Sequence, residues 1–249
     1  MTRRVEVPDD IQIAALQKKR AGTYDLMRPG EGTPWENRGQ SGLFSAFFKN
    51  IGRAMSSPVL LVDHIRRPET TSDINAYVIG CGLMLSIAVL TQSTVMFMTA
   101  RSNPKVILDP TAFWEGAAVM AALMPLVWWL LIGIGCRVYK FLVTGDSKQK
   151  APPVLFQNVL GYTSSPIILA IVPYVGIWIG VVWLMVLWII AGRRRLYIAP
   201  AATVIATIGA IIAMGVLGTA LVLGLYALMN GYGVFGGAIT SATPAVVHS

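Results

Sequence analysis

Long stretches without any charged residue occupy most of the chain after residue 73. Residues 74–100, 116–136, 154–192 and 196–249 contain no Asp, Glu, Lys or Arg. Uncharged apolar runs of about 18 residues or more are typical of helices that cross a bilayer. The pattern predicts an all-α, multi-pass integral membrane protein, and it excludes a soluble enzyme or a disulfide-stapled secreted domain.

The longest central run decides how many spans there are. As one helix, residues 154–192 would extend over about 58 Å, nearly twice the ~30 Å thickness of the hydrocarbon core. Pro173-Tyr174-Val175-Gly176 has the composition of a tight turn between two helices. We therefore predict five spans. They cover about residues 74–98, 113–136, 155–172, 176–192 and 201–229.

The positions of the basic residues give a second, independent test of this count. With five spans and a cytoplasmic N-terminus, all of the 20 Lys and Arg residues except Arg101 and Lys105 fall on the cytoplasmic side, as the positive-inside rule expects. A four-span arrangement would place the basic 137–153 loop and Arg193-Arg194-Arg195 on opposite faces. The charge pattern favours five spans, with the C-terminus outside.

The first 73 residues differ from the rest in being rich in charge. Residues 1–40 mix basic and acidic residues with Pro and Gly, which predicts a flexible cytoplasmic arm with a short helix at 9–20. Residues 41–73 are predicted as an interfacial amphipathic helix and a linker to the membrane domain of residues 74–229. Residues 230–249 form an outer tail.

Residues 41–56 show the spacing of an amphipathic helix that Pro58 ends. The apolar positions recur at intervals of three and four, and the polar positions Lys49, Asn50 and Arg53 are assigned to the opposite face. One interpretation is a helix on the membrane surface with its cations on anionic lipid; the other is a helix packed on the cytoplasmic ends of the spans. The residues expected at the lipid surface are Leu43, Phe44, Phe47, Phe48, Lys49, Ile51 and Arg53.

The chain offers little chemistry for catalysis. Of its residues 55% are hydrophobic and 13% charged, and the two histidines lie outside the spans. Cys81 and Cys136 are interpreted as buried hydrophobes, and Glu115 as a residue of the membrane boundary. We expect no enzyme activity, no catalytic residues, no metal site and no cofactor. The pI of about 9.7 is explained by loop orientation, so no nucleic-acid partner is expected.

Mild polar groups and small residues inside the spans leave alternatives open. Polar groups such as Thr163-Ser164-Ser165 more often bond to neighbouring helices or to their own backbone than line a conduction path. Small residues four positions apart, such as Gly176 with Gly180 and Ala206 with Ala210, suit close packing within the chain. A homodimer seam or a larger membrane-protein complex is the alternative use of such positions.

The order of these features resembles a known family. A Pro-Trp-Glu-Asn-Arg stretch from Pro34 to Arg38 precedes the amphipathic helix, and the third span opens with Gly161-Tyr162 and continues to Pro166. With the Pro173–Gly176 turn, over about residues 34–229, this is similar to the bacterial branch of the Yip family, the five-span proteins with a Ypt/Rab-interacting domain. The residues that carry the resemblance are Gly161, Tyr162, Pro166, Pro173 and Gly176.

The resemblance implies a location and a class of function. It implies a multi-pass protein of the bacterial cell (inner) membrane. The leading hypothesis for its function is a non-enzymatic scaffold or accessory protein that engages lipid or protein partners through the cytoplasmic arm. The family's Asp-Leu-x-Gly-Pro signature is replaced here by Asp25-Leu26-Met27-Arg28-Pro29, so recognition of a Rab-type GTPase is not expected. The alternative is a small-solute transporter or channel with its site at the Pro-broken third and fourth spans.

Overall fold

The computed structural model describes residues 32–66, 72–103, 109–144 and 153–231, and within these ranges the regular structure is entirely helical. Five helical segments are long and apolar enough to cross a membrane, which confirms the predicted all-α, five-span membrane fold. They are α5 (Ser72–Arg101), α6 (Pro110–Thr144), α7 with η1 (Pro153–Tyr162 and Ser165–Ile171), α8 (Gly176–Arg194) and α9 (Pro200–Gly231).

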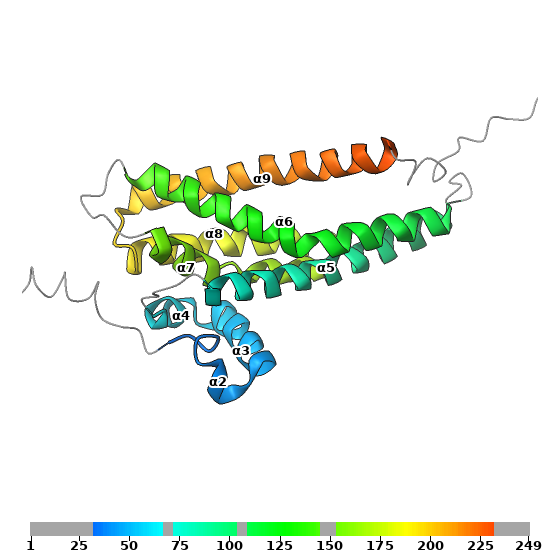
Figure 1. Ribbon diagram of the computed structural model, residues 1–249. Helices are drawn as coiled ribbons and strands as arrows, with labels where there is room; N and C mark the ends of the chain where they lie inside the picture. The colour runs from blue at the N-terminus through cyan, green and yellow to red at the C-terminus, as the bar shows by residue number, and fades with distance from the viewer. Residues whose placement is uncertain (1–31, 67–71, 104–108, 145–152, 232–249) are drawn as a thin grey trace, which may run out of the picture.

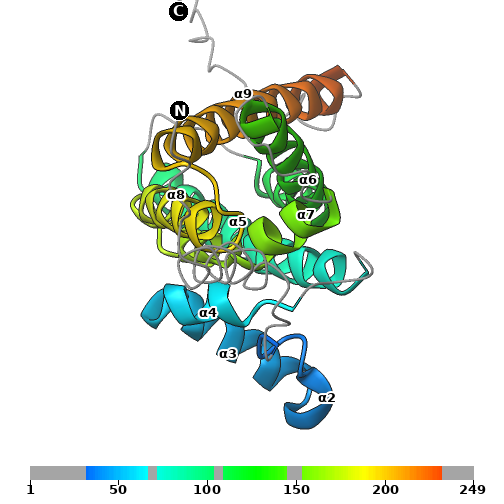
Figure 2. The same ribbon diagram turned by 90° about the vertical axis from the view of Figure 1, so that its left-hand side faces the viewer.

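Residues 32–66 form a small helical group that we call the N-terminal unit. It contains α2 (Arg38–Ser41), α3 (Leu43–Ser56) and α4 (Pro58–His64). Helix α3 ends at Ser56, before Pro58, as predicted. Pro58 is then the first residue of α4, where its missing N–H costs nothing, and α4 lies in the segment predicted as a linker. Figures 1 and 2 show this unit on one flank of the bundle, on the side opposite α9.

Helices α5 and α6 form a long antiparallel hairpin. Their 30 and 35 residues give lengths of about 45 and 52 Å, so both helices extend beyond a hydrocarbon core of ~30 Å. Where they cross, a Cβ at Gly82 would lie 2.5 Å from the Cα of Pro125. Only a glycine lets the two backbones approach this closely.

The second hairpin, α7–η1–α8, is shorter and lies beside the first. The Gln92 side chain of α5 donates a hydrogen bond to the carbonyl oxygen of Ala170 at 3.4 Å, so the end of η1 lies level with Gln92. Helix α5 continues to Arg101, which is about 14 Å farther along its axis. The tip of the second hairpin therefore ends well short of the first.

Helix α9 closes the bundle against α6. Ala206 and Ala210 are completely buried, and a Cβ at Gly209 would lie 2.6 Å from the Leu142 side chain, so this stripe of small residues packs within the chain. Farther along the helix Ala220 and Gly224 are exposed. A homodimer seam on that part of α9 stays a prediction.

The two ends of the bundle differ in chemistry. Arg137, Lys140 and Arg193–Arg195 lie at the end where α6 and α8 finish, which we call the basic end. At the other end the ring of Phe97 lies 5.5 Å from that of Phe113 and 5.6 Å from that of Trp114, and we call it the aromatic end. Five segments bring both basic sequences to one end, as the charge pattern predicts.

The predicted flexible arm is in part folded. Residues 32–40 belong to the N-terminal unit, and Trp35 there is 4% exposed. Its indole N–H donates to the carbonyl oxygen of Asp73 at 2.9 Å, and the Arg38 guanidinium pairs with the Asp73 carboxylate at 2.7 Å. The predicted helix at 9–20 and the tail beyond residue 231 lie outside the described residues.

Candidate functional site

The third span is interrupted beneath the N-terminal unit. Helix α7 ends at Tyr162, and the tighter 3-10 helix η1 begins at Ser165 with Pro166 in its first turn. Proline cannot donate a hydrogen bond to the preceding turn, so the α-helix cannot continue through it. The structure thus places Tyr162 and Pro166, two residues of the predicted family motif, on either side of a break.

Side chains satisfy the carbonyl groups that the break releases. The Thr163 hydroxyl donates back to the carbonyl oxygens of Val159 and Leu160 at 3.0 Å each, and the Trp188 indole of α8 donates to Leu160 at 3.2 Å. Within a membrane, backbone groups freed from a helix need partners inside the protein. The prediction that polar groups of this segment bond to their own backbone is confirmed for Thr163.

Four polar side chains with unsatisfied atoms surround the break, and we call them the polar cluster. They are Asn50 of α3, Tyr77 of α5, and Ser164 and Ser165. The Tyr77 hydroxyl faces Asn50 and Ser165, yet no group among the described residues completes a hydrogen bond to the polar side-chain atoms of the cluster. A buried polar atom without a partner costs about 1–3 kcal/mol, so the cluster is a costly feature of the bundle.

Aromatic rings link the N-terminal unit to the break. Trp35 and Phe47 lie 5.4 and 5.5 Å from the Tyr77 ring, centroid to centroid, and Tyr77 lies 5.4 Å from Tyr162. Such tilted pairs each add about 0.5–1.5 kcal/mol beyond the area they bury. This aromatic chain fixes α3 on the bundle directly above the polar cluster.

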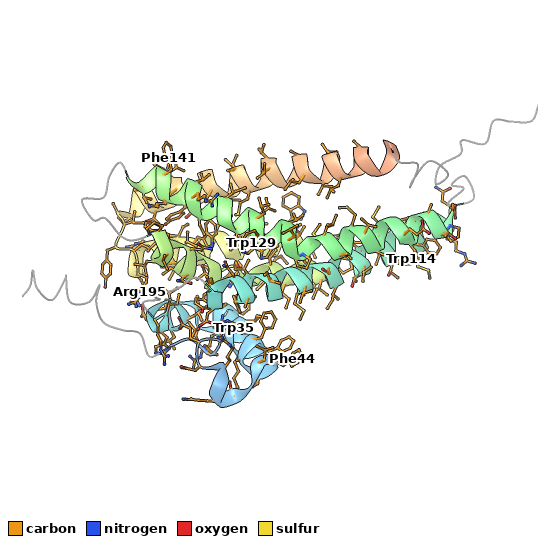
Figure 3. All side chains as sticks on the ribbon, viewed as in Figure 1. Trp35, Phe44, Trp114, Trp129, Phe141 and Arg195 are labelled. Carbon is orange, nitrogen blue, oxygen red and sulfur yellow. The ribbon has the colours of Figure 1, made fainter. Side chains whose placement is uncertain are left out.

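Helix α3 has two apolar faces. One is packed on the spans and the other is exposed, so each of the two interpretations, a packed helix and a membrane-surface helix, describes one face. The docked face holds Phe47 and Ile51, which are 8% exposed. The bare face holds Leu43, Phe44 and Phe48, which are 54%, 77% and 52% exposed. Figure 3 shows Phe44 at the margin of α3, away from the bundle core.

The polar residues of α3 do not all lie where the sequence placed them. Lys49 and Arg53 are exposed as predicted, but Asn50 is fully buried, so its assignment to the polar face is wrong. Residue 50 follows Phe47 by three positions and precedes Ala54 by four, which puts all three on one side of a helix. Asn50 points into the polar cluster instead of toward water.

The glycines of the predicted motif allow close approach between helices. A Cβ at Gly161 would lie 2.6 Å from Ile74, and one at Gly176 would overlap the carbonyl oxygen of Leu169. Gly176 follows Pro173, whose carbonyl oxygen accepts the Val175 N–H at 2.8 Å in the turn between η1 and α8. The structure confirms that this turn closes a hairpin of the third and fourth spans.

An apolar cavity of about 500 Å³ lies between α5, α6, η1, α8 and α9. Its wall includes Trp128 and Met124 of α6 together with Gln92 and Ser93 of α5. Both its volume and its mostly apolar lining with few polar groups are typical of sites for small apolar molecules. It adjoins the tip of the broken hairpin through Ala170 and Tyr174.

Ionisable groups are scarce in this region. No three His, Cys, Asp or Glu side chains of the described residues gather as metal ligands, and Cys81 and Cys136 are buried and unbridged. Glu115 is exposed near the aromatic end. In the N-terminal unit, burial raises the pKa of Glu36, against hydrogen bonds from the N–H groups of Thr33 and Arg66.

Comparison of the chain with models of protein families, with curated proteins and with solved structures gave no match. Functional inference therefore depends on the geometry described above.

Proposed function

We propose that the protein is a non-enzymatic scaffold or accessory protein of the Yip type in a bacterial cell membrane, with its N-terminal unit in the cytoplasm. The observation that carries the proposal is the division of α3 into a docked face and a bare face. Full burial of one Leu or Phe side chain is worth about 1.5–3 kcal/mol. Leaving Leu43, Phe44 and Phe48 bare would waste that energy unless a lipid surface or a partner covers them.

Lipid is the partner that the surroundings of α3 favour. Lys49 and Arg53 are exposed on the same helix, and each cation near an anionic leaflet contributes about 1 kcal/mol. Aromatic and leucine side chains combined with flanking cations are typical of helices that lie in the membrane interface. The N-terminal unit would thus rest on the cytoplasmic leaflet while the docked face holds it to the spans.

Site-directed fluorescence in nanodiscs tests this proposal. A Phe44→Cys variant carries an environment-sensitive dye, because Cys81 and Cys136 are buried. We expect blue-shifted emission that brominated lipids quench. The matched control is Gly39→Cys on α2, an exposed position with open space around it, where neither effect is expected. Equal emission and equal quenching at the two positions would contradict lipid contact by α3.

Transport of a small solute is the second candidate function. The break at Thr163–Ser164, the unsatisfied polar cluster and the apolar cavity resemble the interrupted helices of transporter sites. The test is labelling of a Ser165→Cys variant, in a background without the two native cysteines, by membrane-impermeant thiol reagents added from each side. Labelling from both sides supports alternating access. Protection from both sides argues for a closed scaffold.

A further inference from the structure

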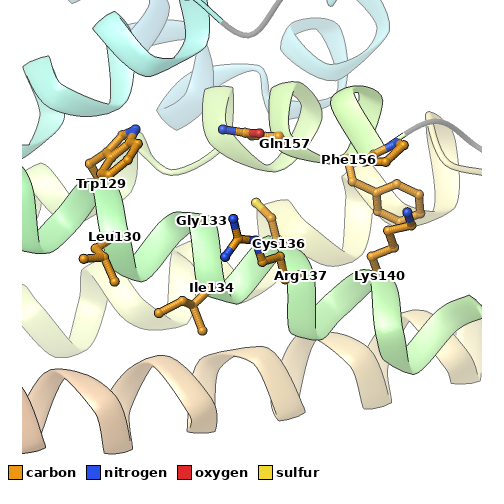
Figure 4. A pocket seen from close by; sticks show the side chains of 10 residues that line it. Trp129, Leu130, Gly133, Ile134, Cys136, Arg137, Lys140, Phe156 and Gln157 are labelled. Atoms are coloured by element: carbon orange, nitrogen blue, oxygen red, sulfur yellow. The ribbon is translucent and has the colours of Figure 1, made fainter.

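A groove on the bundle surface lies between α6 and α7 at the basic end, and we call it the basic groove. It has a volume of about 360 Å³, and its lining includes Arg137 and Lys140 of α6 and Phe156 and Gln157 of α7. Figure 4 shows the two cationic side chains directed from α6 into the space below α7. None of the residues that line this groove belongs to α3.

The groove carries two cations, Arg137 and Lys140, and no acidic residue lines it within the described part of the chain. Arg137 itself is exposed. Other arginines on this side are engaged: Arg194 pairs with Asp63 at 2.7 Å, and Arg195 donates to the carbonyl oxygen of Ile65 at 2.6 Å. Arg137 has no ion pair or hydrogen bond with any described residue, so its five N–H donors are available to an anion.

The inner end of the groove is apolar and rigid. Trp129 and Leu130 line it and are 38% and 39% exposed. The Trp129 indole and the Gln157 amide both donate to the side-chain oxygen of Asn75 at 3.1 Å, which fixes the two walls relative to each other. Along α6 the groove therefore runs from cationic at Lys140 to apolar at Leu130.

The depth of the groove in the bilayer matches its change from a cationic to an apolar end. Trp114 at the aromatic end and Arg137 are separated by 23 positions of one helix, or about 35 Å. Tryptophan residues prefer the headgroup level of the bilayer, and the hydrocarbon core is ~30 Å thick. With Trp114 at one interface, Arg137 lies at the headgroup level of the other.

We infer that the basic groove binds one anionic phospholipid. Its phosphate lies on Arg137 and Lys140, and an acyl chain follows Ile134 and Leu130 toward the bilayer centre. Basic pockets between spans at the cytoplasmic side are suited to anionic headgroups, and the planar guanidinium binds phosphate through two parallel hydrogen bonds. A soluble anion would satisfy the cations but would leave the apolar end of the groove unused.

Native mass spectrometry of the full-length protein, delipidated in detergent and titrated with phosphatidylglycerol or phosphatidylcholine, tests the charge. We expect the wild type to retain one phosphatidylglycerol with at least tenfold preference. Arg137→Gln should lose this preference, and Arg137→Lys should keep part of it because the charge remains without the bidentate geometry. Arg193→Gln removes an exposed cation at the same end and should change nothing. Equal loss in Arg137→Gln and Arg193→Gln would overturn the site.

A steric variant separates the groove from general surface charge. A Cβ at Gly133, which lines the groove, would meet nothing within 4 Å, so Gly133→Leu fills the groove and leaves both cations in place. It should weaken phosphatidylglycerol binding about tenfold, whereas Gly215→Leu, equally unobstructed on α9, should not. Unchanged binding in Gly133→Leu would overturn the proposal.

Inorganic phosphate identifies the source of the anion. Free phosphate is added at about 10 mM, which is above a dissociation constant on the order of 1 mM for weak anion binding. It should fail to displace the bound phosphatidylglycerol. Displacement of the lipid by phosphate would overturn the assignment to a phospholipid and leave an anion site.

Discussion

The two helical hairpins of the bundle satisfy their backbone hydrogen-bonding groups in different ways. Helices α5 and α6 are continuous, and much of their surface is exposed, whereas most of the broken third span is buried in the protein. A helix that faces lipid must satisfy its own backbone, but a buried segment can use side chains from its neighbours. The break at Thr163 is tolerated because α3, α5 and α8 cover it.

The largest change in stability is expected from a substitution in the tightly packed turn of the second hairpin. A side chain at Gly176 would overlap the carbonyl oxygen of Leu169, whereas Gly133 of α6 has open space. We expect Gly176→Leu to lower the free energy of unfolding by about 3 kcal/mol, and Gly133→Leu to leave it nearly unchanged. Melting temperature and elution profile in detergent measure both. Similar values for the two variants would remove the packing argument.

The next effect tests the hydroxyl that supports the break. Thr163→Val leaves the Val159 carbonyl oxygen of a buried segment without its side-chain donor, at a cost of about 1–2 kcal/mol. Thr91 of α5 makes the same type of bond, to Ile87 at 2.9 Å, on an exposed surface, and Thr91→Val is expected to be nearly neutral. Thermal unfolding of both variants decides whether burial makes the difference.

Two serines are expected to respond with opposite signs. In the first hairpin the Ser86 hydroxyl donates to the carbonyl oxygen of Ala121 at 2.6 Å, so Ser86→Ala should destabilise the protein by about 1 kcal/mol. In the polar cluster the Ser164 hydroxyl lies beside the weakly bonding Cys81 thiol and makes no well-formed hydrogen bond to a described residue. Ser164→Ala should therefore stabilise the protein by up to about 1 kcal/mol. Destabilisation by Ser164→Ala would show that the hydroxyl is satisfied in the folded protein.

The smallest effect is a pH dependence confined to the N-terminal unit. Burial raises the pKa of Glu36 from its ordinary value near 4.5, so the folded unit binds a proton more tightly than the unfolded chain. Stability is then greatest below pH 4.5 and is lost as the pH rises through the folded pKa. Hydrogen exchange of residues 32–66 should accelerate over this range in the wild type, beyond the intrinsic rate, but not in Glu36→Gln. An identical pH profile in the variant would exclude Glu36 as the cause.

Much of this architecture is predictable from the sequence because the signals are local. The gaps between charged residues define the spans, and Pro173 with Gly176 marks the turn. Pro166 likewise indicates that the third span is broken, but the groups that stabilise the break are not predictable in the same way. Its stability depends on Trp188, 28 positions from the Leu160 carbonyl it serves, and such partners are known only once the fold is.

The docking of α3 and the basic groove show the same limit. Trp35 bonds to Asp73, 38 positions away, so nothing local distinguishes it from a residue of a flexible arm. Arg137 and Lys140 contribute to the positive-inside pattern, which explains them without any site. The sequence shows that Arg137 and Lys140 are three positions apart and therefore share one side of α6. The opposite wall of the groove comes from α7 and is formed only by tertiary packing.

The short second hairpin has a consequence for the bilayer itself. Val172, Val175 and Trp178 are exposed at its tip, and the end of η1, level with Gln92, lies about 14 Å short of the end of α5. Lipids beside α8 thus meet a shorter apolar wall than lipids beside α5 and α6. Such hydrophobic mismatch is relieved by local thinning of the membrane, at fractions of a kcal/mol per Å. We expect the protein to carry a one-sided dimple in the surrounding leaflet, and to gather where the membrane is already thin or curved.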